Sequence, residues 1–168
     1  MMTNHDEMIS DWKKNAEAHD EANFTYLRSL KLADKSRRTD AAAAARHEQA
    51  FQIIDCTRCA NCCKTLDIRL TADDVDRIAG HLAMTSDAFT ANYLKTVDGD
   101  QFEMVAKPCP FLGADDRCTI YEVRPEGCRG YPHTDKRNFA SRAYGHSANA
   151  RVCPAVFWIV EEMRKNRR

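Results

Sequence analysis

The stretch that decides the fold runs Cys56-Thr57-Arg58-Cys59-Ala60-Asn61-Cys62-Cys63. It holds four of the eight cysteines of the chain, and no cysteine precedes it. The reactivity of a thiol, in metal binding, oxidation and disulfide exchange, matters more than its packing. The cluster therefore predicts a domain that folds around bound metal, over residues 55–168.

The spacing of the cluster suits two kinds of metal chemistry. A Cys-x-x-Cys turn directs two sulfurs and nearby backbone amides toward one centre. Cys62 extends this turn to a third sulfur, as in the run of bacterial ferredoxins, but Leu66 stands where the fourth ligand of that run would fall. Cys109 and Cys153, each followed by proline, are candidates to complete it. Zinc sites commonly combine one Cys-x-x-Cys turn with two distant cysteines, so zinc and an iron–sulfur cluster both remain open.

All eight cysteines are candidate metal ligands, in one or two centres. They are Cys56, Cys59, Cys62, Cys63, Cys109, Cys118, Cys128 and Cys153. The side chains of the adjacent Cys62 and Cys63 are expected to diverge. They would then serve two neighbouring centres, or one would bind while the other packs. Arg124 and Arg129 are expected to hydrogen-bond to thiolates or carboxylates near the metal.

The pattern of apolar residues predicts an α+β fold. We expect a small, irregular, metal-centred cysteine-cluster domain with few short strands, an N-terminal helical hairpin and a C-terminal helix. Residues 1–54 form the helical extension and residues 55–168 the metal-binding domain. A capping-box pattern at Thr71 predicts a helix start, and Pro154 at a first helical position predicts the last helix. The polar, basic residues 134–150 are expected to form an exposed loop.

Composition and charge limit the classes of function. The chain has 25 basic and 25 acidic residues, so its overall charge gives no bias toward nucleic acid. Residues 129–168 carry a local excess of basic residues. These side chains would lie on a solvated surface, offset the negative charge of thiolate–metal centres or bind an acidic partner. No stretch approaches the roughly 20 apolar residues that cross a bilayer, and the polar N-terminus is unlike a secretory signal. We therefore expect a cytoplasmic protein whose thiols stay reduced and bind metal.

Four motifs in order resemble the YkgJ-type CxxCxxCC cysteine-cluster family over about residues 55–155. They are Cys56-x2-Cys59-x2-Cys62-Cys63, Pro108-Cys109-Pro110-Phe111-Leu112, Cys118-Thr119-Ile120-Tyr121 and Arg124-Pro125-x2-Cys128-Arg129-x-Tyr131-Pro132. The resemblance implies a metal-binding domain, since members are described as zinc- or iron-chelating proteins and sometimes as Fe–S oxidoreductases. A related cluster occurs in flagellin lysine methylases, which implies protein modification as a distant alternative.

Four functions follow as hypotheses. The metal holds a fold that recognises an unknown protein partner, or it transfers electrons, or the chain is an enzyme, or it stores or delivers metal. The sequence contains no G-x-G-x-x-G loop, P-loop, H-E-x-x-H or radical-SAM Cys-x3-Cys-x2-Cys pattern. The enzyme hypothesis therefore rests on the family alone, and whether the chain is an enzyme stays open.

Overall fold

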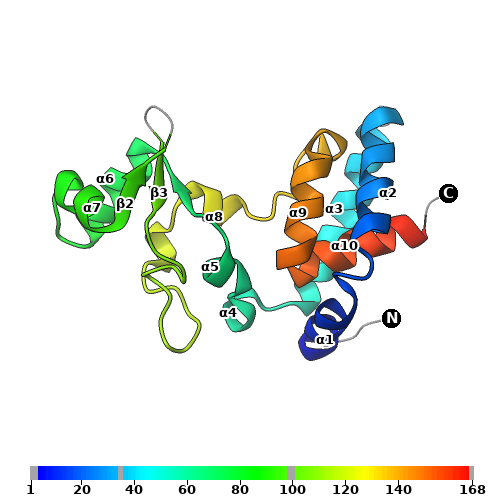
Figure 1. The fold of residues 1–168 in the computed structure, drawn as a ribbon, viewed down its shortest axis with the longest axis horizontal. Helices are drawn as coiled ribbons and strands as arrows, with labels where there is room; N and C mark the ends of the chain where they lie inside the picture. The colour runs from blue at the N-terminus through cyan, green and yellow to red at the C-terminus, as the bar shows by residue number, and fades with distance from the viewer. Residues whose placement is uncertain (1–3, 34–35, 98–100, 167–168) are drawn as a thin grey trace. The chain divides into compact units, whose positions relative to one another are not determined.

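Two segments far apart in the sequence build one helical unit, and the segment between them builds a second unit. The computed structural model describes residues 4–33, 36–97 and 101–166 (Figure 1). The helical unit comprises Met1–Cys59 and Pro132–Arg168, and the sheet unit comprises Ala60–Tyr131.

The helical unit is built from helices of both chain ends. Its elements are α1 (His5–Asn15), α2 (Asp20–Ala33), α3 (Ser36–Ile53), α4 (Cys56–Cys59), the 3-10 helix η2 (Phe139–Arg142), α9 (Ala143–Val152) and α10 (Pro154–Lys165). Helix α10, red in Figure 1, packs against α1, α2, α3 and α9. Its residues Val156, Phe157 and Ile159 are almost fully buried, because neighbouring helices cover it on several sides.

The sheet unit combines short helices with a small antiparallel sheet. Its elements are α5 (Asn61–Thr65), β1 (Arg69–Leu70), α6 (Ala72–His81), α7 (Ser86–Tyr93), β2 (Leu94–Thr96), β3 (Phe102–Met104), the 3-10 helix η1 (Tyr121–Val123) and α8 (Glu126–Gly130). The strand order is β1-β3-β2, and Glu103 of β3 pairs with Arg69 on one side and Lys95 on the other. Ile78 and Phe89 lie at the centre of the core of this unit.

The structure confirms the predicted α+β class with few short strands and a C-terminal helix. The capping box at Thr71 and the proline at the start of α10 are both present. The N-terminal region forms three helices, because the expected first helix is interrupted between α1 and α2. The boundary of the compact units lies at Cys59 rather than at residue 54, and the C-terminal helix belongs with the N-terminal helices, because their apolar faces bury one another.

The prediction of an exposed loop over residues 134–150 is wrong. Residues 139–150 of this segment lie in η2 and α9, and the side chains of Phe139 and His146 are almost fully buried. The carboxylate of Asp40 accepts hydrogen bonds from the amides of Asn138 and Phe139, at 2.9 and 2.8 Å. This contact between distant segments fixes the start of η2. Among the described residues, no helix has both the length and the apolar character needed to cross a membrane.

Candidate metal centre

A single left-handed residue divides the cysteine cluster. Helix α4 ends at Cys59, and Ala60 then adopts φ 49° and ψ 11°, which ends this helix before α5 begins at Asn61. The boundary between the two compact units lies at the same place. Cys56 and Cys59 therefore belong to the helical unit, whereas Cys62 and Cys63 belong to the sheet unit.

The eight predicted ligands thus fall into two sets. The helical unit contains Cys56, Cys59 and Cys153, and the sheet unit contains Cys62, Cys63, Cys109, Cys118 and Cys128. All eight carry thiols rather than disulfides, and all are half-buried except Cys56, which is exposed. Within the described part of the chain, no three His, Cys, Asp or Glu side chains already stand in coordinating positions.

The sulfurs of Cys62 and Cys63 converge, so the expectation that these side chains diverge is wrong. Their Sγ atoms lie 4.0 Å apart. The thiol of Cys62 hydrogen-bonds to the sulfur of Cys63 and, with help from the charge of Lys64, lowers the pKa of Cys63 to about 7. Cys63 is therefore partly ionised at neutral pH, which is the form that binds metal.

Backbone and side-chain contacts hold the segment from Cys109 to Cys118 beside Cys63. The amide of Cys109 donates to the carbonyl of Cys63 at 2.8 Å, and Lys64 pairs with Asp116 at 2.7 Å. An isolated antiparallel bridge joins Leu112 to Cys118. These contacts place the segments of Cys109 and Cys118 beside α5.

The loop between Leu112 and Cys118 leaves little room for a side chain at Gly113. The amide of Gly113 donates to the carbonyl of Arg117 at 2.7 Å and closes the loop. A Cβ atom at Gly113 would lie 2.8 Å from the Asp115 carboxylate and 3.2 Å from that carbonyl. The Asp115 side chain can turn away, so a Cβ atom would require the Arg117 carbonyl to move by only a few tenths of an ångström.

Backbone amides point at two of the sulfurs in this unit. The amide of Phe111 hydrogen-bonds to Cys109, and the amide of Ile120 hydrogen-bonds to Cys118, in each case two residues later. Each bond favours the thiolate, but burial has the larger effect and raises the pKa of both thiols, that of Cys109 to about 11. These amides are arranged to stabilise bound thiolates.

Cys128 completes this set of sulfurs. Burial raises the pKa of Cys128 to about 12, and the nearby sulfurs of Cys63, Cys109 and Cys118 raise it further. The guanidinium of Arg124 acts in the opposite direction on Cys118 and Cys128. Four sulfurs thus lie close enough to influence one another, with a cation beside two of them.

Arg124 and Arg129 donate hydrogen bonds to backbone carbonyls, and not to thiolates or carboxylates of the described residues as the sequence led us to expect. Arg124 donates to the carbonyl of Tyr121 at 2.6 Å and lies over its ring at 3.7 Å. Arg129 donates to the carbonyl of Glu122 and, at 3.0 Å, to that of Arg124, which also accepts from Arg77 at 3.1 Å. The guanidinium groups therefore fix the chain between η1 and α8.

Sequence reasoning missed the role of Asp74 in holding this site together. Its buried carboxylate accepts from the amide of Glu126 at 3.0 Å, and so ties α6 to the start of α8, which carries Cys128. The capping box identified Asp74 as a helix-start residue. It gave no sign of the second contact, 52 residues away.

The helical unit brings its three cysteines together at the start of α10. Cys153 is the N-cap residue of α10, and the amides of Ala155 and Val156 lie near its sulfur and favour the thiolate. Burial raises the pKa of Cys153 to about 12, and the nearby sulfurs of Cys56 and Cys59 contribute. The side chain of Cys153 thus faces the α4 turn.

The basic excess of residues 129–168 is largely engaged within the helical unit. Arg142 donates to the carbonyls of His133, Lys136 and Arg137, and Arg151 forms a bidentate pair with Asp20. Arg164 and Lys165 pair with the buried Glu161. The final two arginines lie outside the described residues. Arg151 and Lys165 remain well exposed, so these ion pairs are compatible with the expected solvated surface.

Comparisons with known proteins place the site in a family. The family model described as "Putative zinc- or iron-chelating domain", named CxxCxxCC, matches residues 55–153. The uncharacterized protein MJ0661 of Methanocaldococcus jannaschii is 32% identical over 82 residues, which cover 47% of this chain and 44% of that protein. The chain therefore matches less than half the length of this relative. No solved structure matches the chain significantly. Because the family match spans more than half of the sequence and all eight cysteines, the chain belongs to the CxxCxxCC family of zinc- or iron-chelating domains.

Proposed function

We propose that the sheet unit binds one metal ion through the thiolates of Cys63, Cys109, Cys118 and Cys128, and that the ion holds this unit together. The single observation that carries the proposal is the mutual proximity of these four sulfurs, which come from three separate segments of the unit. Cys62 then acts as a hydrogen-bond donor to Cys63 rather than as a ligand.

The donor set fits a tetrahedral thiolate site. Zinc prefers four such ligands, at Zn–S distances of about 2.3 Å. Amide N–H groups at Cys109 and Cys118 stabilise thiolate charge, as structural zinc sites require. Four thiolates around a divalent ion leave a net negative charge, which the neighbouring Arg124 offsets.

A bound ion would contribute most to stability where regular structure is sparse. Between β3 and α8, the described residues form only one isolated bridge and one turn of 3-10 helix. An ion held by Cys63, Cys109, Cys118 and Cys128 cross-links this stretch to α5. The free energy of metal binding then adds directly to the folding stability of the sheet unit.

Electron transfer by iron at the same thiolates is the second candidate. Four neighbouring thiolates are also the usual ligand set of iron–sulfur clusters, so the same four sulfurs support it. Metal and acid-labile sulfide analysis of anaerobically purified protein, with a visible spectrum, separates the two. Zinc without sulfide supports the structural role. Iron with sulfide, and absorption that bleaches on reduction, would replace it with electron transfer.

Two matched variants test the ligand assignment. Cys109→Ser should lose the metal of the sheet unit and lower its melting temperature, whereas Cys62→Ser should retain the metal, because serine still donates a hydrogen bond. Unchanged metal content in Cys109→Ser would contradict the proposal. Rapid loss of metal to a weak chelator from the folded wild type would instead indicate delivery of metal, one of the alternatives raised by the sequence.

A further inference from the structure

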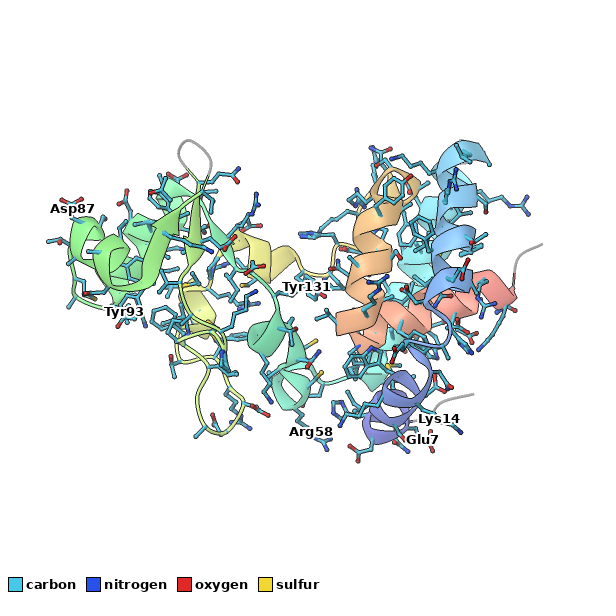
Figure 2. All side chains as sticks on the ribbon, viewed as in Figure 1. Glu7, Lys14, Arg58, Asp87, Tyr93 and Tyr131 are labelled. Atoms are coloured by element: carbon cyan, nitrogen blue, oxygen red, sulfur yellow. The ribbon has the colours of Figure 1, made fainter. Side chains whose placement is uncertain are left out.

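A buried histidine of the helical unit lacks a good hydrogen-bond partner. His146 is 1% exposed and lies on α9, pale orange in Figure 2, which packs against α2. Its ring stacks on that of Phe139 with 4.0 Å between the centroids, so the plane of the ring is fixed. Neither ring nitrogen makes a hydrogen bond of good geometry with the described residues, and only a weak contact with the Phe139 backbone remains. A buried polar group in this state is explained by an ordered water or by a bound ligand.

The half-buried guanidinium of Arg142 acts on this ring and has a free donor of its own. Its two terminal nitrogens donate to the carbonyls of His133, Lys136 and Arg137. Its Nε–H group is buried and has no partner among the described residues. Since all these partners are carbonyls, no carboxylate of the described residues neutralises the charge of Arg142. An anion would supply both the missing acceptor and the missing negative charge.

The protonation state of the ring narrows the kind of anion. Burial, together with the charges of Arg142 and His133, lowers the pKa of His146 to about 4. At neutral pH the ring is therefore uncharged and has one N–H group and one lone pair. An anion that carries a proton fits this set, because its oxygen accepts from Nε of Arg142 while its hydroxyl donates to the lone pair. Water meets the same hydrogen bonds but leaves the charge of Arg142 unopposed.

We propose that Arg142, His146 and His133 form a binding site for hydrogen phosphate, as the free anion or as the phosphate group of an ester. Arg142 and His133 are half-buried, so the anion reaches the site from their side. A buried ring without a good partner lowers stability, and local departures of this kind are expected where a residue serves binding. The inference uses no cysteine and does not rest on the proposed metal site.

Isothermal titration calorimetry of the full-length protein with its bound metal tests the site. Inorganic phosphate and sulfate are titrated separately at equal ionic strength. Phosphate should bind at one anion per chain. Sulfate carries no proton at neutral pH and cannot donate to the lone pair of His146, so it should bind at least about tenfold more weakly. O-phosphoserine, titrated in the same way, separates the two sources of phosphate, because tighter binding than inorganic phosphate would identify an ester as the ligand.

Three variants locate the binding. His146→Leu should weaken phosphate binding at least about tenfold, and the urea midpoint from tryptophan fluorescence checks that the unit stays folded. His146→Gln keeps a donor and an acceptor, so it should bind phosphate more tightly than His146→Leu. Arg151→Ala removes an exposed positive charge from the same helix and, as the matched control, should bind phosphate like the wild type.

Four results would overturn the proposal. They are no binding of phosphate by the wild type, equal binding of phosphate and sulfate, equal binding of phosphate by His146→Leu and the wild type, and an equal loss of binding in Arg151→Ala and His146→Leu. The last result would show that phosphate is attracted only by surface charge.

Discussion

Replacing Asp74 by asparagine should loosen the sheet unit without affecting the helical unit. The Asp74 side chain is 1% exposed and accepts from the amides of Thr71 and Glu126, each at 3.0 Å, and from Arg77. A hydrogen bond to an ionised group contributes about 1.5–3 kcal/mol, and breaking a buried ion pair costs about 3–5 kcal/mol. The Arg77 side chain is 35% exposed, so water partly compensates it for the lost carboxylate. We therefore expect the free energy of unfolding of the sheet unit to fall by about 3 kcal/mol.

The two units can be followed separately in this experiment. Both tryptophans, Trp12 and Trp158, lie in the helical unit, so their fluorescence reports on that unit. Hydrogen exchange of peptides from residues 71–82 and 121–131 reports on the sheet unit. Asp74→Asn should lower protection there by about 100-fold, which is the ratio that about 3 kcal/mol produces. The fluorescence midpoint in urea should not move.

The effect should also depend on pH in a defined direction. Burial alone would raise the pKa of Asp74, but hydrogen bonds from Thr71, Arg77 and Glu126 outweigh it and lower the pKa below 3.8. The stability that Asp74 contributes is therefore present above pH 3.8 and lost as the pH falls through the lower, folded-state pKa. The stability of the sheet unit in wild type and in Asp74→Asn should therefore become equal at acid pH. Equal protection in Asp74→Asn and wild type at neutral pH, or an equal loss in the exposed-site control Asp73→Asn, would refute the reasoning.

Three further predictions concern the helical unit and use tryptophan fluorescence in urea. Neither ring nitrogen of the buried His146 makes a hydrogen bond of good geometry with the described residues, and only a weak contact with the Phe139 backbone remains. His146→Leu should therefore stabilise the unit by about 1 kcal/mol after loss of its stacking on Phe139; a lower midpoint would contradict this. Burial, with the neighbouring positive charge of Arg142, lowers the pKa of His146 from 6.5 to about 4, so the unfolded state takes up its proton first as the pH falls. Wild-type stability should therefore drop by up to about 3 kcal/mol between these values, and His146→Leu should lack this drop. Arg151→Ala removes an exposed ion pair and should lower the free energy of unfolding by less than about 1 kcal/mol, and by less still in added salt. A loss that does not depend on salt would show that solvent does not screen this pair. Glu161 is 2% exposed, and its carboxylate accepts from two basic residues in the last turn of α10. Glu161→Gln should therefore lower the free energy of unfolding by about 3 kcal/mol, and a change within about 0.5 kcal/mol would count against this.

The sequence predicted correctly those helix starts that depend only on neighbouring residues. The capping box at Thr71 and the proline that opens α10 each act within one turn of helix, so their effects can be read from neighbouring residues. The cysteine spacing likewise identified the family and the candidate ligands.

Contacts between distant residues account for what the sequence did not reveal. The segment around Phe139 looks like a loop because its helix start is fixed by Asp40, about a hundred residues earlier. The division of the cluster depends on the left-handed conformation of Ala60, and alanine gives no local sign of it.

The interrupted helical unit has a consequence for biosynthesis. The sheet unit is one continuous segment, so it is complete when Tyr131 leaves the ribosome, whereas the helical unit still waits for α9 and α10. At about 5–20 residues per second, the apolar faces of α2 and α3 stay uncovered for several seconds after they emerge. The nascent chain therefore needs protection at its N-terminal helices during that interval. It also acquires every cysteine of the sheet unit before Cys153 is made, so metal loading during translation would begin with the sheet unit.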